Sequence, residues 1–311
     1  MERQTAIAVA GLRRAYGEHE VLAGIDLTVP RGTVYALLGP NGAGKTTVVH
    51  ILSTLLQPDA GDVRVLGHDV VAEAGAVRAA IGVTGQVSAV DGLLTGTENM
   101  RLMAALHHLD RTEGAERCAD LLARLDLTEA ADRPATTYSG GMRRRLDLAM
   151  TLVGDPQVIF LDEPTTGLDP RSRRALWAII RELVARGVTI LLTTQYLEEA
   201  DQLADRIGVL DGGRIVAEGT ADELKRRVPG GHVRIRVATA DDLARAGAVF
   251  PTATADPDTL ALDVPGGGDV TALRAVLDRA DAAGLAIADL TLHTPDLDDV
   301  FLALTGQEVP A

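Results

Sequence analysis

Short apolar runs recur along the first two thirds of the chain and alternate with amphipathic stretches. The runs have the length and composition of β-strands and lie at Ile7–Val9, Leu27–Val29, Val34–Leu38, Val63–Leu66, Ala80–Thr84, Val158–Leu161, Val188–Thr193 and Ile207–Leu210. Helical spacing of apolar residues follows several of them, at Thr46–Leu56, about Pro170–Arg186 and Leu197–Ala204. Strands that alternate with helices predict an α/β core with a mostly parallel sheet.

One long stretch departs from this alternation. From about Gly92 to Arg133 apolar residues recur at positions i, i+3 and i+4, as in MRLMAALHHL and ERCADLLARLDL. This is the period of an amphipathic helix. We therefore expect a helical insertion at about residues 90–135.

The pattern changes again near RRVPGGH at residues 226–232, where proline and paired glycine favour a linker. After it, strands are expected at Val233–Ala238, Thr259–Val264 and Leu285–Leu292. Helices are expected at about Asp241–Ala248, Val270–Ala283 and Leu297–Leu304. The chain is therefore expected to divide into residues 1–228 and a small α+β domain at residues 229–311.

Composition excludes several classes of protein. Hydrophobic residues make up 46% of the 311 residues and charged residues 24%, as in ordinary globular domains, which excludes a disordered or collagen-like chain. The start of the chain lacks the pattern of a secretory signal, and no run approaches the roughly 18 apolar residues of a membrane span. The single cysteine, Cys118, fits a reducing compartment.

Charge narrows the choice of ligands. A net charge of −14 argues against nucleic acid and against anionic lipid as the main partner. Residues 229–311 hold 5 Arg against 13 Asp and Glu, a net −8, which leaves −6 for the rest. Only Lys45 and Lys225 are lysines among the 30 basic residues. Lys45 lies in a glycine-rich loop, where a compact ammonium fits better than a planar guanidinium.

That loop fits the pattern G-x-x-x-x-G-K-[ST], directly after the strand Val34–Leu38 and at the start of a helix, which is the context that a phosphate-binding loop requires. Its glycines let backbone N–H groups converge on phosphate oxygens, and the helix dipole adds to them. Lys45 would reach the β- and γ-phosphates, and the Thr46 hydroxyl would ligate Mg²⁺. The predicted nucleotide-binding residues here are Gly39, Pro40, Asn41, Gly42, Ala43, Gly44, Lys45, Thr46 and Thr47.

Two further motifs fit phosphate chemistry. The apolar strand Val158–Leu161 ends in Asp162, expected to hold Mg²⁺, and Glu163, expected to act as the base that orients the attacking water. Ser139, Gly140 and Gly141 precede a helical stretch, where free N–H groups could meet a second anion.

Together these motifs resemble the nucleotide-binding subunits of ABC transporters, over about residues 5–225. GPNGAGKT resembles the Walker A loop, YSGGM the signature loop, VIFLDEP the Walker B strand, and TGLD, which ends at Asp169, the D-loop. The resemblance implies that Tyr16 stacks on adenine and that Gln86 is the Q-loop residue that joins Mg²⁺ and the attacking water to the helical insertion. It also implies a P-loop ABC-type ATPase core, in which an antiparallel β subdomain accompanies the mostly parallel sheet.

The chain departs from the family pattern at three positions. Tyr138 and Met142 stand where the signature loop usually has Leu and Gln, and Gln195 replaces the switch histidine. The neutral amide of Gln195 can donate a hydrogen bond to the γ-phosphate, but unlike histidine it cannot transfer a proton or become cationic. These differences and the C-terminal segment Leu297–Gly306 resemble the daunorubicin-resistance subfamily of drug-export ATPases. The expected catalytic residues are Glu163 and Gln195.

The resemblance also implies the partners. Two copies would form a homodimer around ATP and Mg²⁺, with Ser139 and Gly141 of one chain on the γ-phosphate held by Lys45 of the other. A separate integral membrane permease would place the protein at the cytoplasmic face of the cell membrane. The alternatives are a soluble ABC ATPase without a transport role, or a transporter of another substrate such as lipid or polysaccharide. The acidic C-terminal domain is either a stabilising appendage or a module for dimerisation or permease docking.

Overall fold

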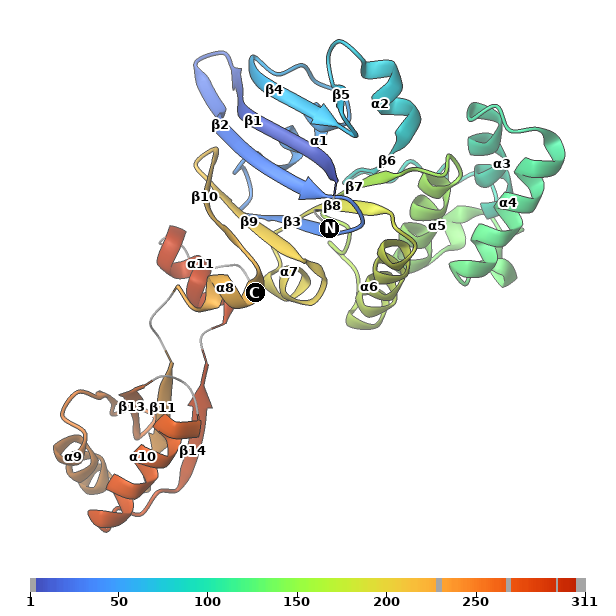
Figure 1. Cartoon of the computed structure of the whole chain (residues 1–311). Coiled ribbons are helices and arrows are strands. Elements are labelled where there is room, and N and C mark those ends of the chain that lie inside the picture. Colours follow the sequence, from blue (N-terminus) through green and yellow to red (C-terminus); the bar gives the residue numbers. More distant parts are fainter. Residues whose placement is uncertain (1–3, 228–230, 267–269, 295, 306–311) are drawn as a thin grey trace. The chain divides into compact units, whose positions relative to one another are not determined.

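The computed structural model describes residues 4–227, 231–266, 270–294 and 296–305. They form two compact units, Met1–Ala221 and Asp222–Ala311, whose elements are labelled in Figure 1. This division lies seven residues before the expected boundary between residues 228 and 229. Residues 228–230 of the expected linker are outside the described part of the chain.

A six-stranded sheet with the order β10-β9-β3-β8-β7-β6 forms the centre of the first unit. Its strands are β3 (Val34–Leu38), β6 (Ile81–Thr84), β7 (Val158–Asp162), β8 (Thr189–Thr194), β9 (Arg206–Asp211) and β10 (Arg214–Gly219). All pairs are parallel except β9 with β10. Every residue of β3, β7 and β8 is buried, because helices or a second sheet cover both faces. The parallel order brings the carboxyl ends of β3, β6, β7 and β8 to one edge.

The second sheet is antiparallel, with the order β2-β1-β4-β5. It consists of β1 (Thr5–Tyr16), β2 (His19–Pro30), β4 (Ala60–Val65) and β5 (His68–Asp69). Helix α1 (Lys45–Leu52) contacts β2 and β4 of this sheet and β7 of the other, so all three share one hydrophobic core. The expected mixed α/β core with an antiparallel β subdomain is confirmed.

Helices complete the first unit. They are α2 (Ala74–Ala80), α3 (Gly96–Leu106), α4 (Arg111–Arg124), α5 (Gly140–Leu152), α6 (Pro170–Ala185) and α7 (Leu197–Leu203), with short 3₁₀ turns at Thr128–Ala130 and Ala135–Thr137. The expected helical insertion is α3 and α4, which pack on α5 at the right of Figure 1. A capping box starts α3, where Thr95 and Glu98 satisfy each other's backbone N–H groups. Among the described residues no helix has the length and apolar character that crossing a membrane requires.

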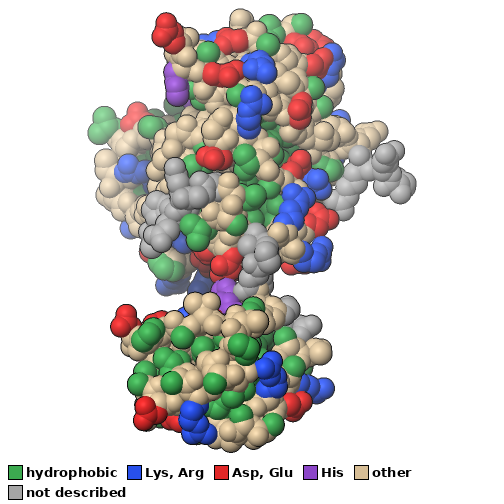
Figure 2. All heavy atoms as spheres, turned by 90° about the vertical axis from the view of Figure 1, so that its left-hand side faces the viewer, with side chains coloured by type: hydrophobic (Ala, Val, Ile, Leu, Met, Phe, Trp, Pro, Cys, Tyr) green, Lys and Arg blue, Asp and Glu red, His purple; other side chains and the backbone are tan. Residues whose placement is uncertain are grey.

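The second unit contains an antiparallel sheet with the order β12-β13-β11-β14. Its elements are α8 (Ala221–Lys225), β11 (His232–Arg236), α9 (Ala240–Val249), β12 (Thr254–Asp256), β13 (Ala261–Pro265), α10 (Val270–Ala282), β14 (Asp289–His293) and α11 (Leu297–Thr305). On β11 the side chains alternate, with Val233 and Ile235 in the core and Arg234 pointing away from it. The expected α+β architecture is confirmed. Charged side chains of both signs are interspersed over the face of this unit that Figure 2 shows.

Some boundaries differ from the expectation. Helix α1 ends at Leu52 and not at Leu56, because Thr54 has a φ of 65°, which no helix accommodates. Strand β14 begins at Asp289 and not at Leu285, although Leu285 is buried in the same core. The apolar pattern thus predicted the burial of Leu285 correctly, but not that residues 285–288 lie outside the strand.

Candidate functional site

A cleft of about 430 Å³ opens where β3 and β6 end. It is lined by Tyr16, Val21, Asn41, Gly42, Gly44, Lys45, Thr46, Thr47, Gln86 and Glu163. The structure thus brings the glycine loop together with residues from β1, from the segment after β6 and from the segment after β7. Gly39, Pro40, Ala43 and Asp162, all described, belong to the same loop and strand ends but are not part of the lining.

The loop between β3 and α1 depends on glycine at a defined position. Gly44 caps α1 with a φ of 104°, in the left-handed region. A Cβ there would lie 2.7 Å from Leu22 Cδ2 and 3.0 Å from the Val21 carbonyl oxygen. Any other residue would therefore be both strained and crowded, and the first N–H groups of α1 would lose their alignment with the cleft.

Lys45 is buried on the floor of the cleft, with 4% of its side chain exposed. Its ammonium donates to the carbonyl oxygens of Gly39 at 2.8 Å and Pro40 at 3.0 Å, and lies 3.4 Å from Glu163 Oε1. Burial lowers the pKa of Lys45, and the nearby Glu163 carboxylate opposes that shift. The site therefore holds a desolvated cation between two loop carbonyls and a carboxylate.

The acidic side of the cleft is held by β8. Thr193 Oγ1 donates to Asp162 Oδ1 and accepts from the Glu163 backbone N–H at 3.0 Å. Glu163 has a φ of 48°, unusual for a residue with a side chain. Its Oε2 accepts from Gln86 Nε2 and Thr166 Oγ1, both at 3.4 Å. The two adjacent carboxylates therefore have different surroundings. Asp162, 2% exposed, is bonded to Thr193, whereas Glu163 lines the cleft and contacts Gln86.

Tyr16 ends β1 at the rim of the cleft and is 50% exposed. The Arg14 guanidinium lies 5.1 Å from the centre of its ring, and Arg14 is itself bound to Asp59. One ring face is thereby supported by the protein. This is the arrangement that a stacking platform for a planar ring needs.

The starts of α5 and α6, which carry Ser139, Gly141 and Asp169, form a second surface. Ser139 caps α5 and accepts from the Met142 N–H at 3.2 Å, while Asp169 caps α6 and accepts from Ser172 Oγ at 2.6 Å. A Cβ on Gly141 would lie 2.4 Å from that Ser172 oxygen, so the two helix starts are in contact. Gln195 follows β8 directly and is half-buried. None of these described residues, nor Gly140, lines the cleft of this chain.

Sequence reasoning missed several residues around the site. Thr193 was predicted only as part of a strand, and Glu199, fully buried against Trp177, was not predicted to be buried. Arg144 was not predicted as a site residue, yet it contacts both segments that carry Gln86 and Glu163. The one available signal was Asp147, a lone acid in the apolar stretch LDLAMTLV and three residues after Arg144.

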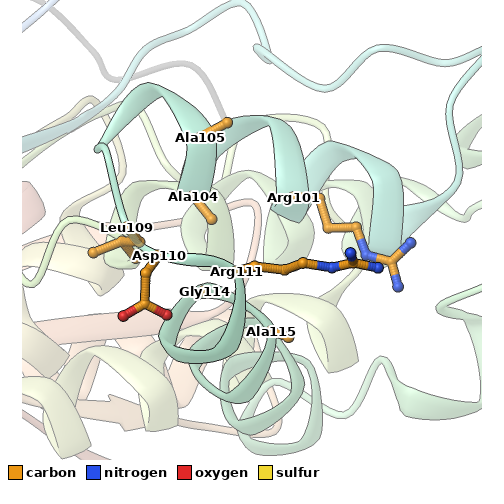
Figure 3. A pocket seen from close by; sticks show the side chains of 8 residues that line it. All are labelled: Arg101, Ala104, Ala105, Leu109, Asp110, Arg111, Gly114 and Ala115. Carbon is orange, nitrogen blue, oxygen red and sulfur yellow. The ribbon is translucent and has the colours of Figure 1, made fainter.

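A second hollow, of about 500 Å³, lies between α3 and α4. Figure 3 shows small side chains such as Ala104 and Ala115 in it, with Arg101 and Arg111 extending from the two helices to the same side. Its one lining carboxylate, Asp110, caps α4 by accepting from the N–H groups of Thr112 and Glu113. None of the residues expected to act on a phosphate lines this hollow.

Comparison with known proteins gives a consistent result. Residues 22–166 match the family described as ABC transporter. The chain is 52% identical to the daunorubicin resistance ATP-binding protein DrrA3 of Streptomyces coeruleorubidus, over 98% of this chain and 97% of that protein. It is 48% identical to the daunorubicin/doxorubicin resistance ATP-binding protein DrrA of Streptomyces peucetius, over 97% and 92% of the two chains. A solved ATP binding subunit of an ABC transporter is similar with a TM-score of 0.65 and 30% identity, over 72% of this chain and 93% of that one.

Proposed function

The chain belongs to the ATP-binding subunits of ABC transporters, and on that premise we propose that it binds and hydrolyses ATP in the cleft to drive a drug exporter. The observation that carries the proposal is the meeting of Lys45 and Glu163 at 3.4 Å inside a cleft that Tyr16 borders. A cation for the phosphates, a candidate base and a stacking ring are thus arranged along one cavity.

The residues of the cleft and of the strand ends beside it have roles that their positions support. The Tyr16 ring stacks on adenine, and the loop Gly39–Thr47 wraps the phosphates with its N–H groups. Lys45 leaves the loop carbonyls and neutralises the β- and γ-phosphates. Glu163 accepts a proton from the attacking water, which Gln86 helps to orient, since its amide already reaches Glu163. Gln195 donates a hydrogen bond to the γ-phosphate from the end of β8.

The donor set also fits Mg²⁺. The Thr46 hydroxyl, the Gln86 amide oxygen and the Asp162 carboxylate are hard oxygen ligands, and Thr193 orients that carboxylate through its hydrogen bond. These three residues would hold the ion, which would supply charge neutralisation to the phosphates. Asp162 is buried beside the cleft, where its Oδ1 accepts from Thr193 Oγ1.

The second surface supports a homodimer. Ser139, Gly140 and Gly141 start a helix of 13 residues yet lie outside the cleft of their own chain. We assign them, with Asp169, to the nucleotide held by a second copy, because N–H groups at a helix start attract a phosphate. ATP then stabilises the closed dimer by contacts that disappear when the γ-phosphate leaves.

A separate membrane permease completes the proposal. The helical insertion beside Gln86 would transmit dimer closure to it, with this chain at the cytoplasmic face of the cell membrane. The printed names of the relatives concern daunorubicin and doxorubicin resistance, so we propose drugs of that kind as the cargo. Cells that express the chain with its permease should accumulate less doxorubicin than cells that express Lys45→Ala.

The ATPase part is tested with Glu163→Gln. The amide keeps the size and the contact with Gln86 but cannot accept a proton, so hydrolysis should fall by about 100-fold or more while ATP binding persists. Size-exclusion chromatography with ATP should then show a trapped dimer. Glu116→Gln, exposed on α4, is the matched control and should behave as wild type. A Glu163→Gln chain that hydrolyses ATP normally would remove the assigned base.

A further inference from the structure

Arg144 is a buried cation that joins three parts of the ATPase unit. It lies in the second turn of α5, five residues after Ser139, and only 11% of its side chain is exposed. Its Nε donates to the Pro164 carbonyl oxygen at 2.9 Å. Its Nη1 donates to Gly85 at 2.7 Å and its Nη2 to Asp162 at 3.1 Å, in both cases to the carbonyl oxygen.

The three carbonyl groups flank the residues assigned to hydrolysis. Gly85 directly precedes Gln86, and Asp162 and Pro164 lie on either side of Glu163. One planar guanidinium therefore fixes the backbone at both ends of the Gln86–Glu163 contact, which is 3.4 Å long. A planar group with donors in a fixed fork sets both distance and direction, which a lysine ammonium cannot do.

Asp147 completes the arrangement one turn further along α5. Its Oδ2 lies 3.5 Å from Arg144 Nη1, and its Oδ1 accepts from the Ala89 N–H at 3.2 Å, three residues after Gln86. The segment around Gln86 is thus held from both sides by one helix. Burying a charged pair gives little net stability unless its geometry is good, and this pair satisfies four backbone groups.

We propose that Arg144 is a positioning residue that sets the distance between Gln86 and Glu163 and ties both to the helix that begins with the signature loop. The inference rests on the proposed function. It has a consequence for the dimer, because Ser139 at the start of α5 serves the nucleotide of the other copy. A shift of α5 therefore moves the hydrolytic residues of its own cleft, so Arg144, together with Asp147, couples the two ATP sites.

The test is the steady-state ATPase activity of the full chain with Mg²⁺ and ATP, with kcat and KM separated. Arg144→Met removes the three hydrogen bonds to backbone carbonyl groups and the contact with Asp147. The value of kcat should fall by roughly 10- to 100-fold, as expected for misplacement of about 1 Å. KM should stay within about twofold, since the hydrogen bonds of Arg144 go to Gly85, Asp147, Asp162 and Pro164 and not to the phosphate-binding loop. Arg144→Lys keeps the charge beside Asp147 and should keep kcat low while recovering much of the thermal stability.

Arg145→Met is the matched control. Arg145 is the next residue of α5, with 19% of its side chain exposed, but it donates to the carbonyl oxygens of Leu125 and Asp126 in the helical insertion. Its loss should lower stability without lowering kcat. The inference is overturned if either Arg144 variant keeps kcat within about twofold of wild type, if the loss appears in KM, or if Arg145→Met lowers kcat equally. Absence of hydrolysis in the wild-type chain would instead overturn the proposed function, and this inference with it.

Discussion

Glu199 makes the stability of the ATPase unit depend on pH in a way that can be worked out in advance. Its side chain is fully buried on α7, and its Oε1 accepts from Trp177 Nε1 at 3.1 Å. Burial raises the pKa of Glu199 above 4.5, and the hydrogen bond from Trp177 offsets only part of that shift. The folded chain therefore keeps this proton at pH values where the unfolded chain has lost it.

The sign and the size follow from proton linkage. Between the unfolded and the folded pKa, unfolding releases one proton, so the free energy of unfolding falls by about 1.4 kcal/mol for each pH unit. The contribution of this residue is fully present below about pH 4.5 and is lost as the pH rises through the folded pKa. Glu199→Gln removes the ionisation but retains an acceptor for Trp177. The variant should thus gain stability over wild type as the pH rises.

Trp177 is the only tryptophan of the chain and contacts Glu199 directly, so its fluorescence reports on this region. Urea unfolding of wild type and Glu199→Gln would be compared from about pH 4 to about pH 8. Glu198→Gln is the control, since Glu198 is exposed and paired with Arg173 at 3.6 Å; exposed pairs contribute about 0–1 kcal/mol. If the free energies of unfolding of wild type and Glu199→Gln change in parallel with pH across this range, the reasoning is refuted. An equal effect of Glu198→Gln would also refute it.

Three further outcomes are expected. Lys45→Ala should lower phosphate release from ATP by at least about 100-fold, because nothing else among the described lining residues is a cation; an unchanged rate would remove the assigned role of the loop. Gln195→His should raise kcat a few-fold and add a pH dependence near the ordinary histidine pKa of about 6.5, so a flat profile with an unchanged rate would mark Gln195 as a tolerated exchange. Deletion of residues 230–311 should leave ATP binding intact, since the first unit has its own core, but abolish co-purification with the permease; normal assembly would favour a stabilising appendage.

Much of the fold could be predicted because its signals are local. The strand β3, its glycine loop and α1 are contiguous, so a window of about twenty residues contains the whole phosphate-binding unit. The hairpin partner β10 was not predicted, because Arg214 and Glu218 break the apolar pattern of an edge strand that pairs only with β9. The short elements α2, β5, α8 and β12 were likewise too short to give a period.

The candidate site divides in the same way. All residues that line the cleft except Val21 were predicted, those after β3 and β7 from motifs and Tyr16 and Gln86 from family resemblance. Their support was not, because it comes from pairing across the sheet. Strand β8 lies between β3 and β7, and this order alone brings Thr193 to Asp162, 31 residues away.

By itself, the sequence determined which segments form strands and helices, where a phosphate-binding loop lies, and which family the chain resembles. Only the tertiary structure decided which of several residues of the same type is buried and which distant segments it contacts. Glu198 and Glu199 are adjacent and chemically identical, yet one is exposed and the other fully buried. Arg143, Arg144 and Arg145 form a single run, yet only Arg144 reaches the segments around Gln86 and Glu163. The physical reason is that periodicity depends on neighbours in the chain, whereas burial and hydrogen-bond partners depend on distant segments that meet only after folding.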